Sequence, residues 1–77
     1  MAATSEEWAE RVKRYLKAEL KRADLSYAEL AEKLTEMGLD ETEGSVAVKV
    51  NRGTFPAWFM IAAMKATGRG TIRVDDF

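Results

Sequence analysis

A capping box at Ser26 and Glu29 is the feature that most constrains what this chain can fold into. In this pattern the serine hydroxyl and the glutamate carboxylate each accept a hydrogen bond from a backbone amide at the start of a helix, and a leucine on either side adds a hydrophobic staple. Apolar residues then recur at helical spacing up to Met37, and Gly38 is placed to end the helix. The sequence therefore predicts a short second helix with one apolar face for neighbouring helices to cover.

Three further helices are predicted around it. Thr4 and Glu7 form a capping pattern that starts a first helix near Ser5. Its apolar residues recur at helical spacing and predict a core-facing stripe, made of Trp8, Val12, Leu16, Leu20 and Ala23. A third helix, about residues 43–52, is capped by Asp40 or Thr42. We expect Val46 and Val50, one turn apart, to face the core.

The fourth predicted helix, about residues 56–66, is apolar all the way round, so it is either central in the domain or half-buried in a partner. Gly53 ends the third helix before it, and Pro56 is tolerated in its first turn. After it, Thr71 to Val74 alternate polar and apolar residues, which predicts a short strand or extended tail. The expected fold is a single all-α domain, residues 1–77, with four helices, a helix-turn-helix arrangement and a short extended C-terminal tail.

Composition excludes several classes of function. The 77 residues include no Cys and no His, which rules out thiolate or imidazole metal sites and nucleophiles that need a Cys or His partner. The carboxylates fall on predicted surface helices or at the terminus, so we expect no catalytic residues, no enzyme activity, no metal and no cofactor. No apolar stretch approaches the roughly 20 residues of a membrane span, and no signal peptide is evident. We expect a cytoplasmic protein.

Charge is unevenly distributed although the net charge is only -1. Residues 11–22 hold six basic residues and one acid, whereas residues 24–43 hold seven acids and one lysine. The two blocks can neutralise each other across a pair of helices, or the basic block can face a polyanion. The small net charge argues against indiscriminate polyanion binding.

The third helix carries the candidate functional residues. Arg and Lys suit guanine edges or phosphates, Asn suits adenine, and Ser or Thr suits phosphates. The sequence places such side chains on the outer side of this helix and just beyond it, and we predict double-stranded DNA contacts from Ser45, Lys49, Asn51, Arg52 and Thr54. The helix would act as a recognition helix.

The chain also resembles known families. The segment Leu25-Ser26-Tyr27-Ala28-Glu29-Leu30-Ala31-Glu32-Lys33-Leu34, followed by Asn51-Arg52-Gly53-Thr54-Phe55-Pro56-Ala57, resembles the small bacterial family DUF6471, a domain of unknown function. More distantly it is similar to lambda-repressor-like, Xre-type helix-turn-helix domains. The closer resemblance implies a fold; the distant one implies transcriptional regulation, with residues 45–52 in the major groove. Against the Xre pattern, the connection before the third helix is several residues longer and the tail replaces a fifth helix.

A different class of function is open as an alternative. The same scaffold can serve as a protein-interaction module that uses the apolar fourth helix instead of the third. A homodimer is predicted on this surface, because so apolar a helix leaves an exposed patch, with interface residues Trp58, Phe59, Ile61, Ile72 and Val74. The monomeric alternative is that the tail, with Ile72, Val74 and Phe77, folds back over the helix.

Overall fold

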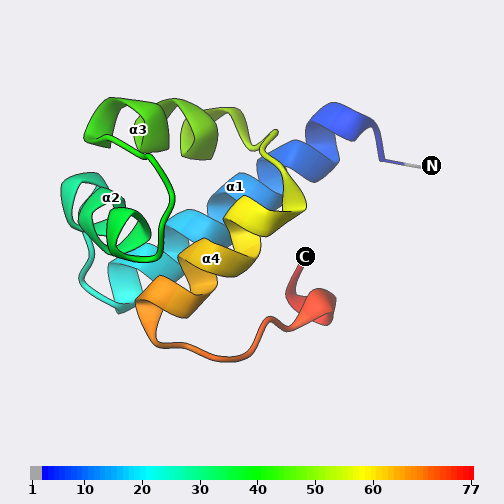
Figure 1. Cartoon of the computed structure of the whole chain (residues 1–77). Coiled ribbons are helices and arrows are strands. Elements are labelled where there is room, and N and C mark those ends of the chain that lie inside the picture. Colours follow the sequence, from blue (N-terminus) through cyan, green and yellow to red (C-terminus); the bar gives the residue numbers. More distant parts are fainter. Residues whose placement is uncertain (1–2) are drawn as a thin grey trace.

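The computed structural model describes residues 3–77 and contains four α-helices (Figure 1). These are α1 (Ser5–Arg22), α2 (Tyr27–Glu36), α3 (Glu43–Arg52) and α4 (Ala57–Thr67), followed by the 3-10 turn η1 (Val74–Asp76). Residues 3–77 contain no β-strand. The predicted all-α class and the four helices are confirmed.

Local hydrogen bonds explain where the first three helices begin. The Thr4 side chain accepts a hydrogen bond from the Glu7 amide, at 3.1 Å, at the start of α1. Both bonds of the predicted Ser26 and Glu29 capping box are present at the start of α2, each at 3.1 Å. For α3 the cap is Thr42, one of the two residues that the sequence left open.

The core is a single cluster built from all four helices. Helix α3 packs on α1 and α2, and α4 packs on the same two helices. Val46 and Val50 of α3 are fully buried, as predicted. They join Leu16, Leu20, Leu30, Ala31, Leu34, Phe59, Ala62, Ala63 and Met64. Helix α4 therefore buries one side against the rest of the domain and leaves Trp58 and Ile61 of its other side exposed.

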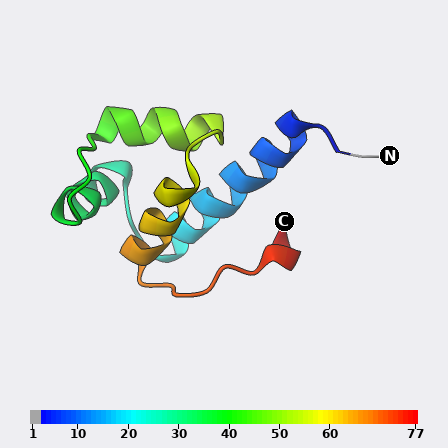
Figure 2. The same cartoon turned by 45° about the vertical axis from the view of Figure 1, so that its right-hand side comes forward.

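Two predicted core residues lie at the surface instead. Trp8 is 49% exposed because the first turns of α1 project past the other helices (Figure 2), and the Arg11 guanidinium covers part of its ring at 4.5 Å. Met37 is 44% exposed because α2 ends at Glu36, which places Met37 beyond the last turn. Helical periodicity predicts the face of a helix correctly but not how far neighbouring helices cover it.

The C-terminal segment folds back towards α1. It is extended after α4, as predicted, but it closes in η1 instead of a strand. Phe77 stacks on Tyr15 of α1 with the ring centroids 4.3 Å apart, and the Arg73 amide donates to the Tyr15 hydroxyl at 3.4 Å. Ile72 packs against the core cluster. Within residues 3–77, no helix combines the length and the hydropathy needed to cross a bilayer.

Candidate nucleic-acid interface

The outer face of α3 is an open surface. Gly44, Val48 and Arg52 follow one another at intervals of four residues, so they form one stripe along the helix, and all three are exposed. The stripe borders a shallow groove that continues over Thr54 and Pro56. Val48 is 49% exposed. We name Gly44, Val48 and Arg52 the outer stripe.

Gly53 fixes where the end of this stripe lies. Its φ of 67° is left-handed, and its amide donates to the carbonyls of Lys49 and Val50 at 3.1 and 3.2 Å. A Cβ at this position would overlap the carbonyl oxygen of Ala9 in α1. Glycine is therefore required both by the backbone conformation and by the close approach of α3 to α1.

This approach brings the C-terminal end of α3 beside the first half of α1. Asn51, Arg52 and Thr54 line one hollow together with Ser5 and Lys13 of α1. The Lys13 ammonium pairs with Glu10 at 3.0 Å, so this lysine contributes little net charge to the hollow. The cation at this end of the helix is Arg52, which forms no ion pair within residues 3–77.

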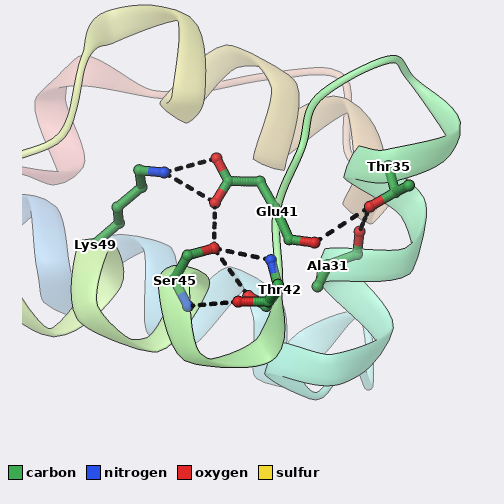
Figure 3. Close-up of polar contacts among 6 residues, drawn as sticks. All are labelled: Ala31, Thr35, Glu41, Thr42, Ser45 and Lys49. Carbon is green, nitrogen blue, oxygen red and sulfur yellow. Dashed lines mark hydrogen bonds and ion pairs between the residues drawn. The ribbon is translucent and has the colours of Figure 1, made fainter.

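A buried carboxylate holds one residue of the first turn of α3, Ser45, and one of its last turn, Lys49. Glu41 is 7% exposed, and the Lys49 ammonium donates to its two oxygens at 2.9 and 2.7 Å (Figure 3). The Ser45 hydroxyl donates to Oε1 of the same carboxylate at 2.6 Å and accepts from the Thr42 amide at 2.8 Å. Lys49 also lies over the Phe59 ring, 5.5 Å from its centroid. The charge of Lys49 is thus satisfied inside the protein.

The environment of Glu41 favours its charged form. Burial by itself raises the pKa of this carboxyl, but the hydrogen bonds from Lys49 and Ser45 and the positive charge of Lys49 outweigh it. The net result is a lowered pKa, so Glu41 is ionised at neutral pH. Its pair with Lys49 persists under physiological conditions.

A second set of bonds ties the connection between α2 and α3 to α2. The Thr35 hydroxyl lies 2.8 Å from the Ala31 carbonyl and 3.3 Å from the Glu41 carbonyl (Figure 3). The residue whose side chain holds α3 is therefore itself anchored on α2. These contacts fix the position of α3 relative to α2 across the connection between the two helices.

The structure divides the five predicted DNA contacts into two groups. Asn51, Arg52 and Thr54 are exposed and lie together at the C-terminal end of α3. Ser45 and Lys49 are partly buried and bind Glu41 instead. Sequence reasoning missed the role of Glu41, because eight residues separate it from Lys49 and no periodic pattern joins the two.

Val48 is the other residue that the sequence analysis missed. The sequence analysis gives this residue no role, although its spacing of four residues from Arg52 places both on one face. That spacing is a signal that could have identified it.

The predicted dimer residues also separate. Trp58 and Ile61 of α4 are 52% and 54% exposed, as an interface requires. Phe59 is fully buried, so its assignment to an interface is wrong: the helix turns this side chain into the protein's own core. Ile72 likewise packs on that core, and Val74, 78% exposed, lies in the tail segment that folds towards α1.

The comparisons with known proteins give one match. A family model described as "Domain of unknown function (DUF6471)" matches residues 8–72. No curated protein and no solved structure matches the chain.

Proposed function

We propose that this chain, which belongs to the DUF6471 family, binds double-stranded DNA through the outer face of α3. The observation that carries the proposal is the exposed C-terminal end of that helix, where Arg52, free of any ion pair within residues 3–77, lies beside Asn51 and Thr54. A helix that presents such side chains on an open face can enter the major groove.

Each exposed residue suits a different contact. The Arg52 guanidinium can donate two parallel hydrogen bonds to a guanine edge or bind a phosphate, and the Asn51 amide can pair with adenine. The exposed Val48 methyl groups can contact a thymine methyl. Thr54 can donate to a phosphate oxygen. Glu41 is a positioning residue here, because it orients the helix through Lys49 and Ser45 without facing the DNA.

The charge distribution sets limits on the affinity. Helix α2 and the connection after it are acidic, with exposed Glu29, Glu32, Glu36, Asp40 and Glu43. These carboxylates repel phosphates that lie beyond the immediate contact with α3. We therefore expect few neutralised phosphates and a correspondingly shallow dependence of affinity on salt.

A titration of a fluorescent mixed-sequence duplex at low salt tests the proposal, with fluorescence anisotropy as the readout. We expect Arg52→Ala to weaken binding about ten-fold, since a direct arginine contact is worth about 1–3 kcal/mol. Arg14→Ala is the matched control, because it removes the same charge from an exposed position of α1 away from the outer stripe. Equal losses for the two variants, or no binding at low salt, would refute the proposal.

A second function is favoured by a separate observation. Trp58 and Ile61 leave an apolar strip on α4, which is a surface typical of protein interaction. On this alternative the domain binds protein and not DNA. Ile61→Glu would then abolish binding of the partner protein, and Arg52→Ala would leave that binding unchanged. DNA binding predicts the opposite result for the two variants.

A further inference from the structure

We infer that the groove between the end of α2 and the outer side of α4 binds a second copy of this chain around a two-fold axis. The groove is lined by Met37 and Leu39 on one side and by α4 on the other, with Trp58, Ile61, Ala62 and Lys65. Its volume is about 460 Å³. The inference stands on this groove alone and does not depend on DNA binding.

The groove and its margin are apolar and accessible. Met37, Trp58 and Ile61 are 44%, 52% and 54% exposed, and each contributes to the same surface. Trp58 and Ile61 are one turn apart on α4 and form a ridge, while the small, 7% exposed Ala62 lines the groove beside them. A surface that carries both a ridge and a hollow can fit a copy of itself, as a two-fold interface requires.

No other part of the described chain covers this ridge. The C-terminal segment is the one part of the sequence expected to fold back over α4, and it goes to α1 instead. There Phe77 stacks on Tyr15, and Ile72 packs on the core. The monomeric alternative needs the C-terminal segment to cover the ridge, but this segment contacts α1 instead. The ridge therefore remains accessible to a partner.

Charges at the groove favour a second copy as that partner. Lys65 is the single charged residue that lines the groove, and it forms no ion pair within residues 3–77. Glu36 and Asp40 adjoin Met37 and Leu39 on the opposite side, and neither has an ion-pair partner within those residues. In a two-fold dimer, Lys65 of each copy would lie against Glu36 and Asp40 of the other. The lysine and the carboxylates would then gain ion-pair partners that a single copy does not provide.

Such a dimer leaves the outer stripe of α3 uncovered. None of Gly44, Val48 and Arg52 lines this groove. Self-association and DNA binding therefore use different surfaces, and a dimer would present two copies of α3.

Sedimentation velocity from micromolar to millimolar concentration tests the inference on the full chain. The wild-type chain of 8.6 kDa is expected to approach twice that mass with rising concentration. Ile61→Glu should raise the dissociation constant about ten-fold or more, because it puts a charge into the centre of the interface. Val74→Glu is the matched control, since Val74 is 78% exposed and lies outside the groove.

Circular dichroism of each variant distinguishes dissociation from unfolding. A wild-type chain that remains monomeric over the whole concentration range would overturn the inference. The groove would then be a site for a different protein. So would a dimer that tolerates Ile61→Glu but dissociates with Val74→Glu.

A charge reversal tests the orientation. Lys65→Glu should weaken the dimer, because it sets like charges against each other across the axis. Adding Asp40→Lys to that variant should restore self-association. If the double variant remains as weak as the single one, the two-fold arrangement is wrong.

Discussion

Two groups of polar residues on α3 are of similar types but are used differently. Ser45 of the first turn and Lys49 of the last turn bind Glu41 inside the protein. At the C-terminal end, Arg52, Asn51 and Thr54 are exposed and beside an open hollow. The difference teaches that a basic residue on the outer side of a helix is available to a ligand only when no buried carboxylate lies within its reach.

The two groups are also placed by different means. Side-chain hydrogen bonds and an ion pair hold Ser45 and Lys49 against the α2–α3 connection, which Thr35 anchors to α2. The C-terminal end of α3 is placed by backbone contact, where Gly53 lies against Ala9 of α1. Polar bonds tolerate some adjustment, whereas two backbones in contact leave no room for an added atom.

Gly53→Ala should have the largest effect on stability, because it disturbs the contact that places the exposed C-terminal end of α3 against α1. We expect a loss of about 3 kcal/mol, from a left-handed backbone that alanine disfavours and from overlap with Ala9. Gly68→Ala is the control: its φ of 75° is similar, but an added Cβ would meet no atom within 4 Å. That variant should lose only about 1 kcal/mol. Urea unfolding measures both, and equal losses would show that the approach to α1 is not what requires glycine.

Glu41→Gln should have the next largest effect, because it removes the charge that binds Lys49 inside the protein. Removing one partner of a buried ion pair leaves the other uncompensated, and with Lys49 partly exposed we expect a loss of about 2 kcal/mol. Lys49→Met should cost a similar amount, and the double variant less than the sum of the two. Additive losses in a double-mutant cycle by urea unfolding would mean that the two side chains do not stabilise each other.

The same pair predicts a dependence of stability on pH. The pKa of Glu41 is lowered from 4.5 in the folded protein, so its contribution is present above pH 4.5 and is lost as pH falls through the lowered pKa. The difference in unfolding free energy between wild type and Glu41→Gln should therefore shrink below pH 4.5. Hydrogen bonds from Lys13 and from the Ser26 amide also lower the pKa values of Glu10 and Glu29, but these groups titrate in both proteins and cancel in the difference. A difference that stays constant in acid would contradict this role of Glu41.

Arg52→Ala should have the smallest effect on stability, because its side chain is exposed and unpaired within residues 3–77. We expect a change below about 0.5 kcal/mol by urea unfolding. This result would complete the comparison: Lys49, which is paired with Glu41, stabilises the fold, and the exposed Arg52 does not. A loss as large as that of Glu41→Gln would mean that Arg52 also has a structural role.

The sequence predicts most of the fold because its signals are local. Capping residues such as Ser26 and Thr42 mark helix starts, and the spacing of Val46 and Val50 indicates the buried side of α3. What it does not predict depends on distant contacts. Trp8 is exposed because the first turns of α1 project past the other helices, and Phe59 is buried because α4 has one covered side although its sequence is apolar all round.

The candidate site was predictable only in part, for the same reason. Arg52, Asn51 and Thr54 are near the end of a helix and are exposed as expected. The capture of Lys49 by Glu41 depends on how the α2–α3 connection folds over α3, and no pattern in the sequence encodes that path.

The most direct test of DNA binding by the outer face of α3 is an NMR titration of the isotopically labelled full chain with a mixed-sequence duplex at low salt. The account predicts amide shifts at Val48, Asn51, Arg52 and Thr54, with Trp58 and Ile61 of α4 unchanged. Shifts confined to α4, or no shifts at Arg52 when the duplex is in excess, would contradict it.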